Sequence, residues 1–222
     1  MIKFENVTKK LDSLELLKNF SIEFEENKIT CLFGPSGVGK TTIANIASGL
    51  INVDSGNVSG TEKTVYSYVF QEPRLLPWYS VYDNIDFVLK NVYDKENRVK
   101  IINSYLKLVE LDGYESYKPS ALSGGMCQRV SLARAFAYPS NFLILDEPFK
   151  GLDIKLKNEI VGLFKKLYKE SKRTVLFITH DVDEAVNLSD HIYVIDNRPV
   201  EIIKKLNLTK NNKDEIKKFL FS

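Results

Sequence analysis

The chain has 222 residues, of which 44% are hydrophobic and 27% are charged. That length allows one large α/β domain or two small ones. The apolar fraction is enough for a sizeable core, which excludes intrinsic disorder, collagen-like repeats and mini-proteins. Lysine and arginine number 31 against 29 acidic residues, and a net charge of +2 argues against a nucleic-acid binder held by bulk charge.

The N-terminal segment and the cysteines predict a cytosolic chain, or one attached to a membrane through a partner. Residues 1–8 show neither the basic start nor the apolar stretch of a secretory signal. No apolar run approaches the ~18 residues that a membrane-spanning helix needs. Cys31 and Cys127 lie far apart in the sequence, and with only two histidines we expect no zinc site.

Hydrophobic periodicity predicts strands alternating with helices, which is typical of a doubly wound α/β core. Continuous apolar runs at 142–145 and 175–178 suit strands of a parallel sheet that is covered on both faces. The stretch 73–120 lacks strand signals, which indicates a helical insertion. The remaining expected elements are a strand over 28–33, a Gly-rich turn over 34–39, helices with apolar residues at 43–50, 81–92, 99–109 and 156–167, a helix over 126–137, and strands over 64–70 and 191–195.

The Gly-rich turn matches the phosphate-loop pattern GxxxxGK[ST] at every fixed position. Glycines let consecutive backbone N–H groups converge on phosphates, the lysine reaches the β- and γ-phosphates, and the threonine hydroxyl is a ligand for Mg²⁺. A ligand-free turn would hold this lysine and threonine only by accident, so the motif predicts a nucleoside triphosphate site. Its residues are Gly34, Pro35, Ser36, Gly37, Val38, Gly39, Lys40 and Thr41.

Two carboxylates end the predicted strand at 142–145. Ligands of parallel sheets bind at the carboxyl ends of strands, so Asp146 is suited to hold Mg²⁺ and Glu147 to polarise the attacking water. An Asp-Glu pair that simply ends a strand in solvent is the alternative. The phosphate loop upstream favours the functional interpretation.

The segment 122–130, LSGGMCQRV, resembles the signature sequence of ABC-type ATPases. The other motifs of that family follow its order: a glutamine loop at 69–72, the carboxylate strand, a D-loop at 151–153 and a switch histidine at 179–181. The resemblance runs from about residue 2 to about residue 204. It implies an α/β P-loop NTPase ABC-type ATPase core over 1–205 with a small antiparallel β subdomain and a helical subdomain at about 73–137, followed by a short tail over 206–222.

The resemblance also implies residue roles and a dimer that sandwiches two MgATP. Ser123, at a helix N-cap, and its neighbours would bind the γ-phosphate held by the other subunit; in isolation, a Ser-Gly-Gly turn that only starts a helix would be the favoured alternative. His180 would hold the γ-phosphate, although a surface histidine at a strand end is the alternative. The implied set is catalytic Glu147, His180 and Gln71; ATP-binding 34–41, Thr42 and Leu11; signature Ser123, Gly124, Gly125 and Gln128; dimer D-loop Asp153; and metal-binding Thr41, Gln71 and Asp146.

Three positions depart from the family pattern. Leu11 stands where members usually carry an aromatic residue that stacks on adenine, so the base would gain apolar contact without stacking. Met126 replaces the commonest glutamine of the signature. Lys150 precedes the D-loop where small residues are usual, and we have no physical account of it.

The segment 71–78, QEPRLLPW, is similar to that of importer ATPases for nitrate, sulfonates, taurine and thiamine precursors. The implied protein is a peripheral ATPase on the cytoplasmic membrane face, bound to permease subunits and served indirectly by an extracytoplasmic solute-binding protein, with no nucleic-acid partner. Leu75, Leu76 and Trp78 would contact the permease, or else form core of the helical insertion. An exporter or lipid-handling ATPase is the alternative function; a phosphate-loop kinase or an ABC-type repair protein fits the motifs and the short insertion less well.

Overall fold

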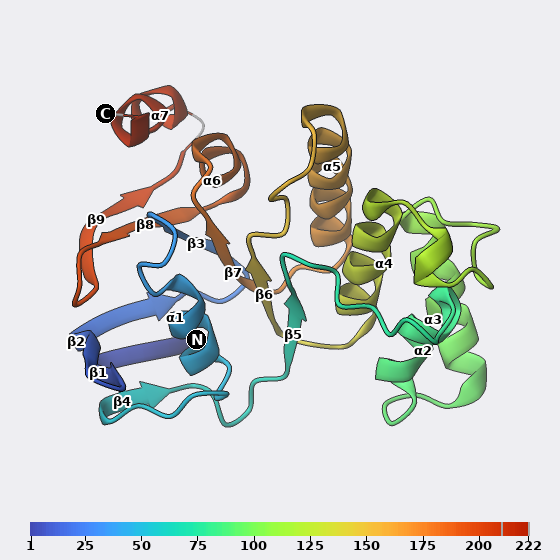
Figure 1. The fold of residues 1–222 in the computed structure, drawn as a ribbon, viewed down its shortest axis with the longest axis horizontal. Helices are drawn as coiled ribbons and strands as arrows, with labels where there is room; N and C mark the ends of the chain where they lie inside the picture. The colour runs from blue at the N-terminus through green and yellow to red at the C-terminus, as the bar shows by residue number, and fades with distance from the viewer. Residues whose placement is uncertain (210, 222) are drawn as a thin grey trace. The chain divides into compact units, whose positions relative to one another are not determined.

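The computed structural model describes residues 1–209 and 211–221 (Figure 1). Its internal contacts divide the chain into two compact units. The first unit comprises residues 1–66, 141–147 and 173–222, and the second comprises residues 67–140 and 148–172. Each unit has a core of its own.

The first unit is built on parallel strands in the spatial order β6-β7-β3-β8, with β9 pairing antiparallel to β8 at the edge (Figure 1). Continuous runs of buried apolar residues form β3, β6 and β7, as the sequence predicts for strands covered on both faces. The strands are β3 (Ile29–Phe33), β6 (Phe142–Asp146), β7 (Thr174–Thr179), β8 (His191–Asp196) and β9 (Glu201–Asn207). Their parallel pairing brings the carboxyl ends of β3, β6 and β7 to one edge of the sheet.

A second, antiparallel sheet completes the β-structure of this unit, in the order β2-β1-β4. Its strands are β1 (Ile2–Leu11), β2 (Leu14–Phe24) and β4 (Ser55–Ser59). The rings of Phe4 and Phe24 meet edge-on at 6.0 Å, and Phe24 meets Phe142 of β6 at 5.9 Å. These buried aromatic contacts join the small antiparallel sheet to the parallel sheet.

Three helices belong to the first unit: α1 (Lys40–Ala47), α6 (Val182–Leu188) and α7 (Lys213–Phe221). The first two contact β7, and α6 also contacts β3 and α7. The segment expected as a tail, 206–222, thus contains the end of β9 and the helix α7, while residues 210 and 222 of it lie outside the described residues.

The second unit is helical apart from most of β5 (Tyr66–Val69), whose first residue belongs to the first unit. Its helices are α2 (Val81–Leu89), α3 (Lys95–Leu108), α4 (Gly124–Ala137) and α5 (Ile154–Glu170), with a 3₁₀ turn over Pro119–Ala121. Side-chain oxygens cap each helix at its first turn: Ser80 for α2, Asp94 for α3, Ser123 for α4 and Asp153 for α5. The buried rings of Phe136, Phe149 and Phe164 form the centre of its core.

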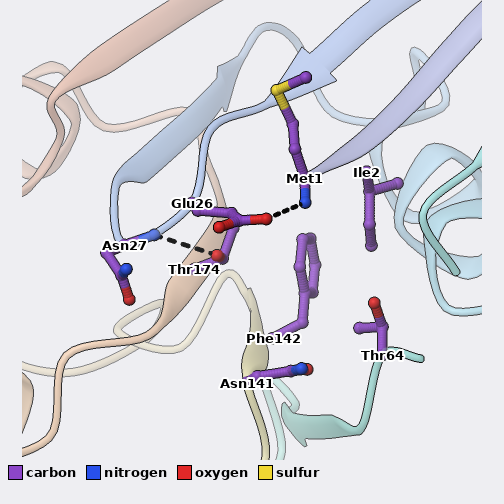
Figure 2. Close-up of a pocket in the computed structure, with 8 residues that line it drawn as sticks. All are labelled: Met1, Ile2, Glu26, Asn27, Thr64, Asn141, Phe142 and Thr174. Atoms are coloured by element: carbon purple, nitrogen blue, oxygen red, sulfur yellow. Dashed lines mark hydrogen bonds and ion pairs between the residues drawn. The ribbon is translucent and has the colours of Figure 1, made fainter.

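A cavity of about 240 Å³ lies at the amino ends of β3, β6 and β7 (Figure 2). The α-ammonium of Met1 pairs with Glu26 there, and the Asn27 N–H donates to the Thr174 hydroxyl at 3.1 Å. The Asn141 side chain accepts from the Val65 N–H at 2.9 Å. This cavity is therefore at the edge of the sheet opposite to the phosphate loop, and its polar groups hold the amino ends of the strands together.

The expected strands and helices of both units all occur, with boundaries shifted by a few residues. Hydrophobic periodicity did not predict β1, β2, β4, β9, α6 or α7. In the part of the chain that the structure describes, no helix has the length and apolar character needed to cross a bilayer.

Candidate functional site: a phosphate loop beside two carboxylates

The phosphate loop connects β3 to α1 in the first unit. Gly39 adopts φ +123°, a conformation that side-chain-bearing residues rarely reach, and α1 begins at the next residue. Among the described residues no side chain caps α1, whereas α2 to α6 each begin with a side-chain cap. No side-chain oxygen thus occupies the N-terminus of α1, and the partial positive charge of a helix N-terminus favours an anion.

Lys40 places a cation at the centre of this loop. Its side chain is only 5% exposed, and its ammonium donates to the carbonyls of Gly34 at 2.7 Å and Pro35 at 2.8 Å. A second cation, the guanidinium of Arg198 in the β8–β9 turn, donates to the Gly37 carbonyl. Arg198 was not among the residues predicted from the sequence, because an Arg-Pro turn after a strand carries no signal that it faces the phosphate loop.

Thr41 and Asp146 come from different segments and meet at the carboxyl edge of the sheet. The Thr41 hydroxyl donates to the Asp146 carboxylate at 2.9 Å. A hydroxyl and a carboxylate oxygen beside a phosphate loop fit Mg²⁺, which takes one or two protein oxygens and completes its shell with phosphates and water. No cluster of three histidine, cysteine or acidic side chains that could hold a metal ion occurs within residues 1–209 and 211–221.

Glu147 and His180 follow the neighbouring strands β6 and β7. The backbone of Glu147 is in the left-handed region at φ +46°, and its N–H donates to the Ile178 carbonyl at 3.0 Å. Left-handed conformations of non-glycine residues concentrate at functional sites. Nδ1 of His180 lies 3.2 Å from Oε1 of Glu147, and the imidazole is exposed while the carboxylate is largely buried. A carboxylate held in this way can act as a base toward a water beside a bound phosphate.

Leu11 lies at the tip of the β1–β2 hairpin, where it pairs with Leu14. Both side chains are substantially exposed, Leu11 by 38%. Further along β2, Leu16 packs against Gly39 of the phosphate loop, and its carbonyl accepts from the Val200 N–H at 2.8 Å. The hairpin therefore presents a small apolar surface near the loop, which includes Leu14, a residue that was not predicted from the sequence.

The remaining predicted residues belong to the second unit. Ser123 is exposed and accepts from the Met126 N–H at 3.3 Å as the N-cap of α4. Gly125 is buried, and a Cβ there would come within 2.6 Å of Leu156. Gln128 is 2% exposed, and its amide donates to the Pro148 carbonyl at 2.6 Å, so its side chain fixes the backbone at Pro148. Gln71 is exposed between β5 and α2, and Asp153 caps α5.

Comparison with known proteins identifies the family of the chain. The profile of the ABC transporter family matches residues 17–150, which is more than half of the chain. The chain belongs to the ABC transporter family. The expectation of an α/β P-loop ATPase of the ABC type is therefore confirmed at the level of family and fold.

Two relatives illustrate the similarity to importer cassettes of this family. The sulfate/thiosulfate import ATP-binding protein CysA of Mannheimia succiniciproducens is 38% identical over 93% of this chain, which spans 62% of the length of that relative. The aliphatic sulfonates import ATP-binding protein SsuB of Bacillus anthracis is 36% identical over 88% of this chain and 80% of its own length. The resemblance to sulfonate-type importer ATPases is thereby confirmed.

Solved structures of ABC cassettes share the fold. A dimeric structure of MJ0796, described as a bacterial ABC transporter cassette, superposes with a TM-score of 0.81 at 30% identity and covers 94% of this chain and 99% of its own. A second dimeric structure of MJ0796, bound to ADP and Pi in a post-hydrolysis state, superposes with a TM-score of 0.80. At this identity the similarity extends beyond the fold to the family.

Proposed function

We propose that this chain is the ATP-hydrolysing subunit of an ABC importer for a small solute, working as a dimer that sandwiches two MgATP. One observation carries the proposal. At a single edge of the first unit, the uncapped α1 with Lys40, the Thr41–Asp146 pair and the Glu147–His180 pair lie together. Phosphate binding, metal binding and water activation are the three requirements of phosphoryl transfer to water.

In the proposed ground state the backbone of residues 37–42 and the Lys40 ammonium bind the β- and γ-phosphates. Thr41 and Asp146, whose side chains already meet at 2.9 Å, would hold Mg²⁺. The metal supplies charge neutralisation at the phosphate oxygens. Arg198 supports the loop through the Gly37 carbonyl. Leu11 and Leu14 provide apolar contact for the base.

In the proposed hydrolytic step Glu147 accepts a proton from the attacking water, whose oxygen bonds to the γ-phosphorus while the bond from that phosphorus to the β–γ bridging oxygen breaks and ADP leaves. His180 contacts the γ-phosphate and, through Nδ1, the Glu147 carboxylate, so that a single imidazole aligns base and phosphate. Supporting this step, Oε1 of Glu147 lies 3.2 Å from Nδ1 of His180, within hydrogen-bond distance. The His180 imidazole is 46% exposed, so an entering triphosphate can reach it.

The proposed dimer places the signature of one copy on the triphosphate of the other. Ser123 and Gly124 are exposed at the N-terminus of α4, and a Cβ on Gly124 would meet no described atom within 4 Å. A glycine with no local steric need at a helix N-terminus suits the close approach of a phosphate. Asp153 would face the other copy's phosphate loop. Gln128 supports the signature from inside the second unit.

The proposed permease contact is the aromatic surface formed by the exposed Trp78 and Phe87 and the half-buried Tyr79 between them. Trp78 is 66% exposed, which removes it from the core of the helical insertion, and its ring lies 6.4 Å from that of Tyr79. Tyr79 in turn lies 5.9 Å from Phe87. Together with the sulfate and sulfonate names of the relatives, this surface supports docking on permease subunits at the cytoplasmic face, with solute delivered by an extracytoplasmic binding protein.

The proposal is tested by measuring ATP binding and steady-state phosphate release with the purified chain and MgCl₂. We expect the unchanged chain to bind and hydrolyse ATP, and Lys40→Ala to weaken ATP binding at least about tenfold, because a buried charge–phosphate contact is lost. Lys63→Ala, an exposed lysine of the same unit, serves as the matched control. Absence of MgATP binding by the folded chain, or equal affinity of the Lys40→Ala variant, would overturn the proposal.

A further inference from the structure

Glu184 is a buried carboxylate in the first turn of α6 to which neither the family motifs nor the proposed mechanism assign a role. It is 7% exposed. Burial of a carboxylate is costly unless hydrogen bonds compensate it. Cys31, on the strand β3 that α6 contacts, is fully buried, and burial raises the pKa of its thiol, with the charge of Glu184 adding to this effect. Glu184 therefore occupies a dry position, and its contacts need an explanation.

The contacts of Glu184 close a ring of hydrogen bonds around the segment 179–181. Oε2 of Glu184 accepts from the Thr179 hydroxyl at 2.6 Å. The same hydroxyl oxygen accepts from the Asp181 N–H at 3.0 Å, and Oδ1 of Asp181 accepts from the Glu184 N–H at 3.0 Å. The Asp181 N–H and the Glu184 carboxylate are thus both bonded to the Thr179 hydroxyl, which links the residues on either side of residue 180 to one buried side chain.

His180 is the residue that this ring encloses. Thr179 is 2% exposed at the end of β7, whereas the imidazole of His180 projects outward to Oε1 of Glu147 at 3.2 Å. Bonds that link the residues before and after an exposed side chain limit the positions that its own backbone can take. The ring therefore restricts the segment from which the His180 imidazole reaches Glu147.

Helix capping does not account for the ring. The side chain of Asp181 already caps α6 by accepting from the Glu184 N–H, a bond that needs only the backbone of Glu184. The Glu184 carboxylate adds the short bond to Thr179, and an apolar side chain would fill a buried position at lower desolvation cost. A carboxylate kept here serves the conformation of the loop more than the stability of the helix.

We propose that Glu184 is a positioning residue for hydrolysis, which holds the Thr179–Asp181 segment so that His180 stays aligned with Glu147. The inference rests on the proposed function for its catalytic consequence. Its geometric content, the dependence of the His180 orientation on Glu184, stands separately and is measured separately.

The geometric part is tested by NMR on the full chain labelled with ¹⁵N-histidine. The chain has two histidines, so only two imidazole spin systems are expected, and His180→Ala assigns them. We expect Glu184→Ala to shift the His180 ring signals and to leave those of His191, which is bonded to Asn207, in place. Glu184→Gln, whose amide oxygen can still accept from Thr179, should restore the His180 signals. Unshifted His180 signals in a folded Glu184→Ala variant would overturn the proposal.

The catalytic part is tested by the steady-state kinetics of ATP hydrolysis. We expect Glu184→Ala to lower kcat between about tenfold and a hundredfold with little change in the KM for ATP, because misplacing a positioned group affects the transition state. Thr179→Val, which removes the hydroxyl and keeps the shape, should do the same, and the double variant should be no slower. Asp183→Ala, an exposed acid in the same helical turn, is the control with unchanged kcat.

The outcomes separate the two proposals. An unchanged chain without ATPase activity contradicts the proposed function, while the histidine signals still decide the role of Glu184. An active chain whose Glu184→Ala and Thr179→Val variants keep the original kcat overturns the positioning role and leaves the ATPase intact. If Glu184→Ala does not fold, as judged by its thermal unfolding, Thr179→Val carries both measurements.

Discussion

At Glu147 both the backbone and the side chain are constrained. A left-handed φ in a non-glycine residue costs of the order of 1–3 kcal/mol, and the structure sustains it through the bond from the Glu147 N–H to the Ile178 carbonyl of the neighbouring strand. The conformation directs the carboxylate to His180. This geometry at the end of a central strand is what distinguishes Glu147 from an acidic residue that ends a strand in solvent.

Leu11 permits a test of base recognition at the residue scale. Replacing it by tyrosine adds a ring at the tip of the β1–β2 hairpin, and stacking on adenine should contribute about 0.5–1.5 kcal/mol. We expect Leu11→Tyr to bind ATP about two- to tenfold more tightly, with a smaller gain for triphosphates with smaller bases. Competition against a fluorescent nucleotide measures the ratio of the two dissociation constants, that of the variant and that of the unchanged chain.

Leu50→Tyr is the matched control for this substitution. Leu50 is exposed beyond the C-terminal end of α1, away from the phosphate loop at the other end of that helix. Its substitution should leave nucleotide affinity unchanged. Equal affinities for Leu11→Tyr and the unchanged chain would show that Leu11 does not contact the base.

At the scale of elements, the helix N-termini divide into two kinds. Side chains cap α2 to α6, whereas α1 begins after Gly39 with no described side-chain cap. The N-terminus of α4 is capped by Ser123, yet the capping residue is itself exposed. Such an end can be stable in one copy and still offer N–H groups to a phosphate from another.

A substitution at the cap of α4 separates these two roles. Aspartate caps helices as well as serine does, so Ser123→Asp should change the free energy of unfolding by less than about 1 kcal/mol. Its negative charge would face the γ-phosphate of the other copy. We therefore expect ATP binding by a single copy to persist and hydrolysis to fall at least about a hundredfold.

The reciprocal exchange Asp94→Ser at the cap of α3 is the control, and it should leave both binding and hydrolysis unchanged. Hydrolysis is measured by phosphate release and binding by fluorescence titration below the concentration at which copies associate. Loss of ATP affinity in the isolated Ser123→Asp chain would contradict a signature that acts on the other copy.

At the scale of the whole molecule, the central strands and the longer helices were predictable from the sequence. The strands are continuous apolar runs, and the helices show a regular 3.6-residue apolar periodicity. The strands β1 and β2 lack a regular pattern of this kind. Bulges shift their register between Phe4 and Val7 and again near Lys9, and Asn6 adopts a positive φ, so the period-two alternation is broken. The five residues of β4 carry almost no apolar signal.

The site was predictable to the extent that its residues lie in contiguous motifs. The phosphate loop, Asp146, Glu147 and His180 follow strands whose parallel order brings them to one edge. Contacts between distant segments were not predictable: nothing in the sequence indicated that Arg198 donates to Gly37, or that the Gln128 amide is buried on Pro148. The spacing of Asp181 and Glu184 is typical of a helix start, and only the structure adds the bond to Thr179.

The central claim is that two copies of this chain close on MgATP and that Glu147 then drives hydrolysis. The most direct measurement is the mass of the Glu147→Gln variant by light scattering with ATP and Mg²⁺, with Glu62→Gln, an exposed acid, as the control. The account predicts a stable species of twice the monomer mass and hydrolysis slowed at least about a hundredfold. A Glu147→Gln variant that stays monomeric with ATP bound, or hydrolyses it at the original rate, would contradict the account.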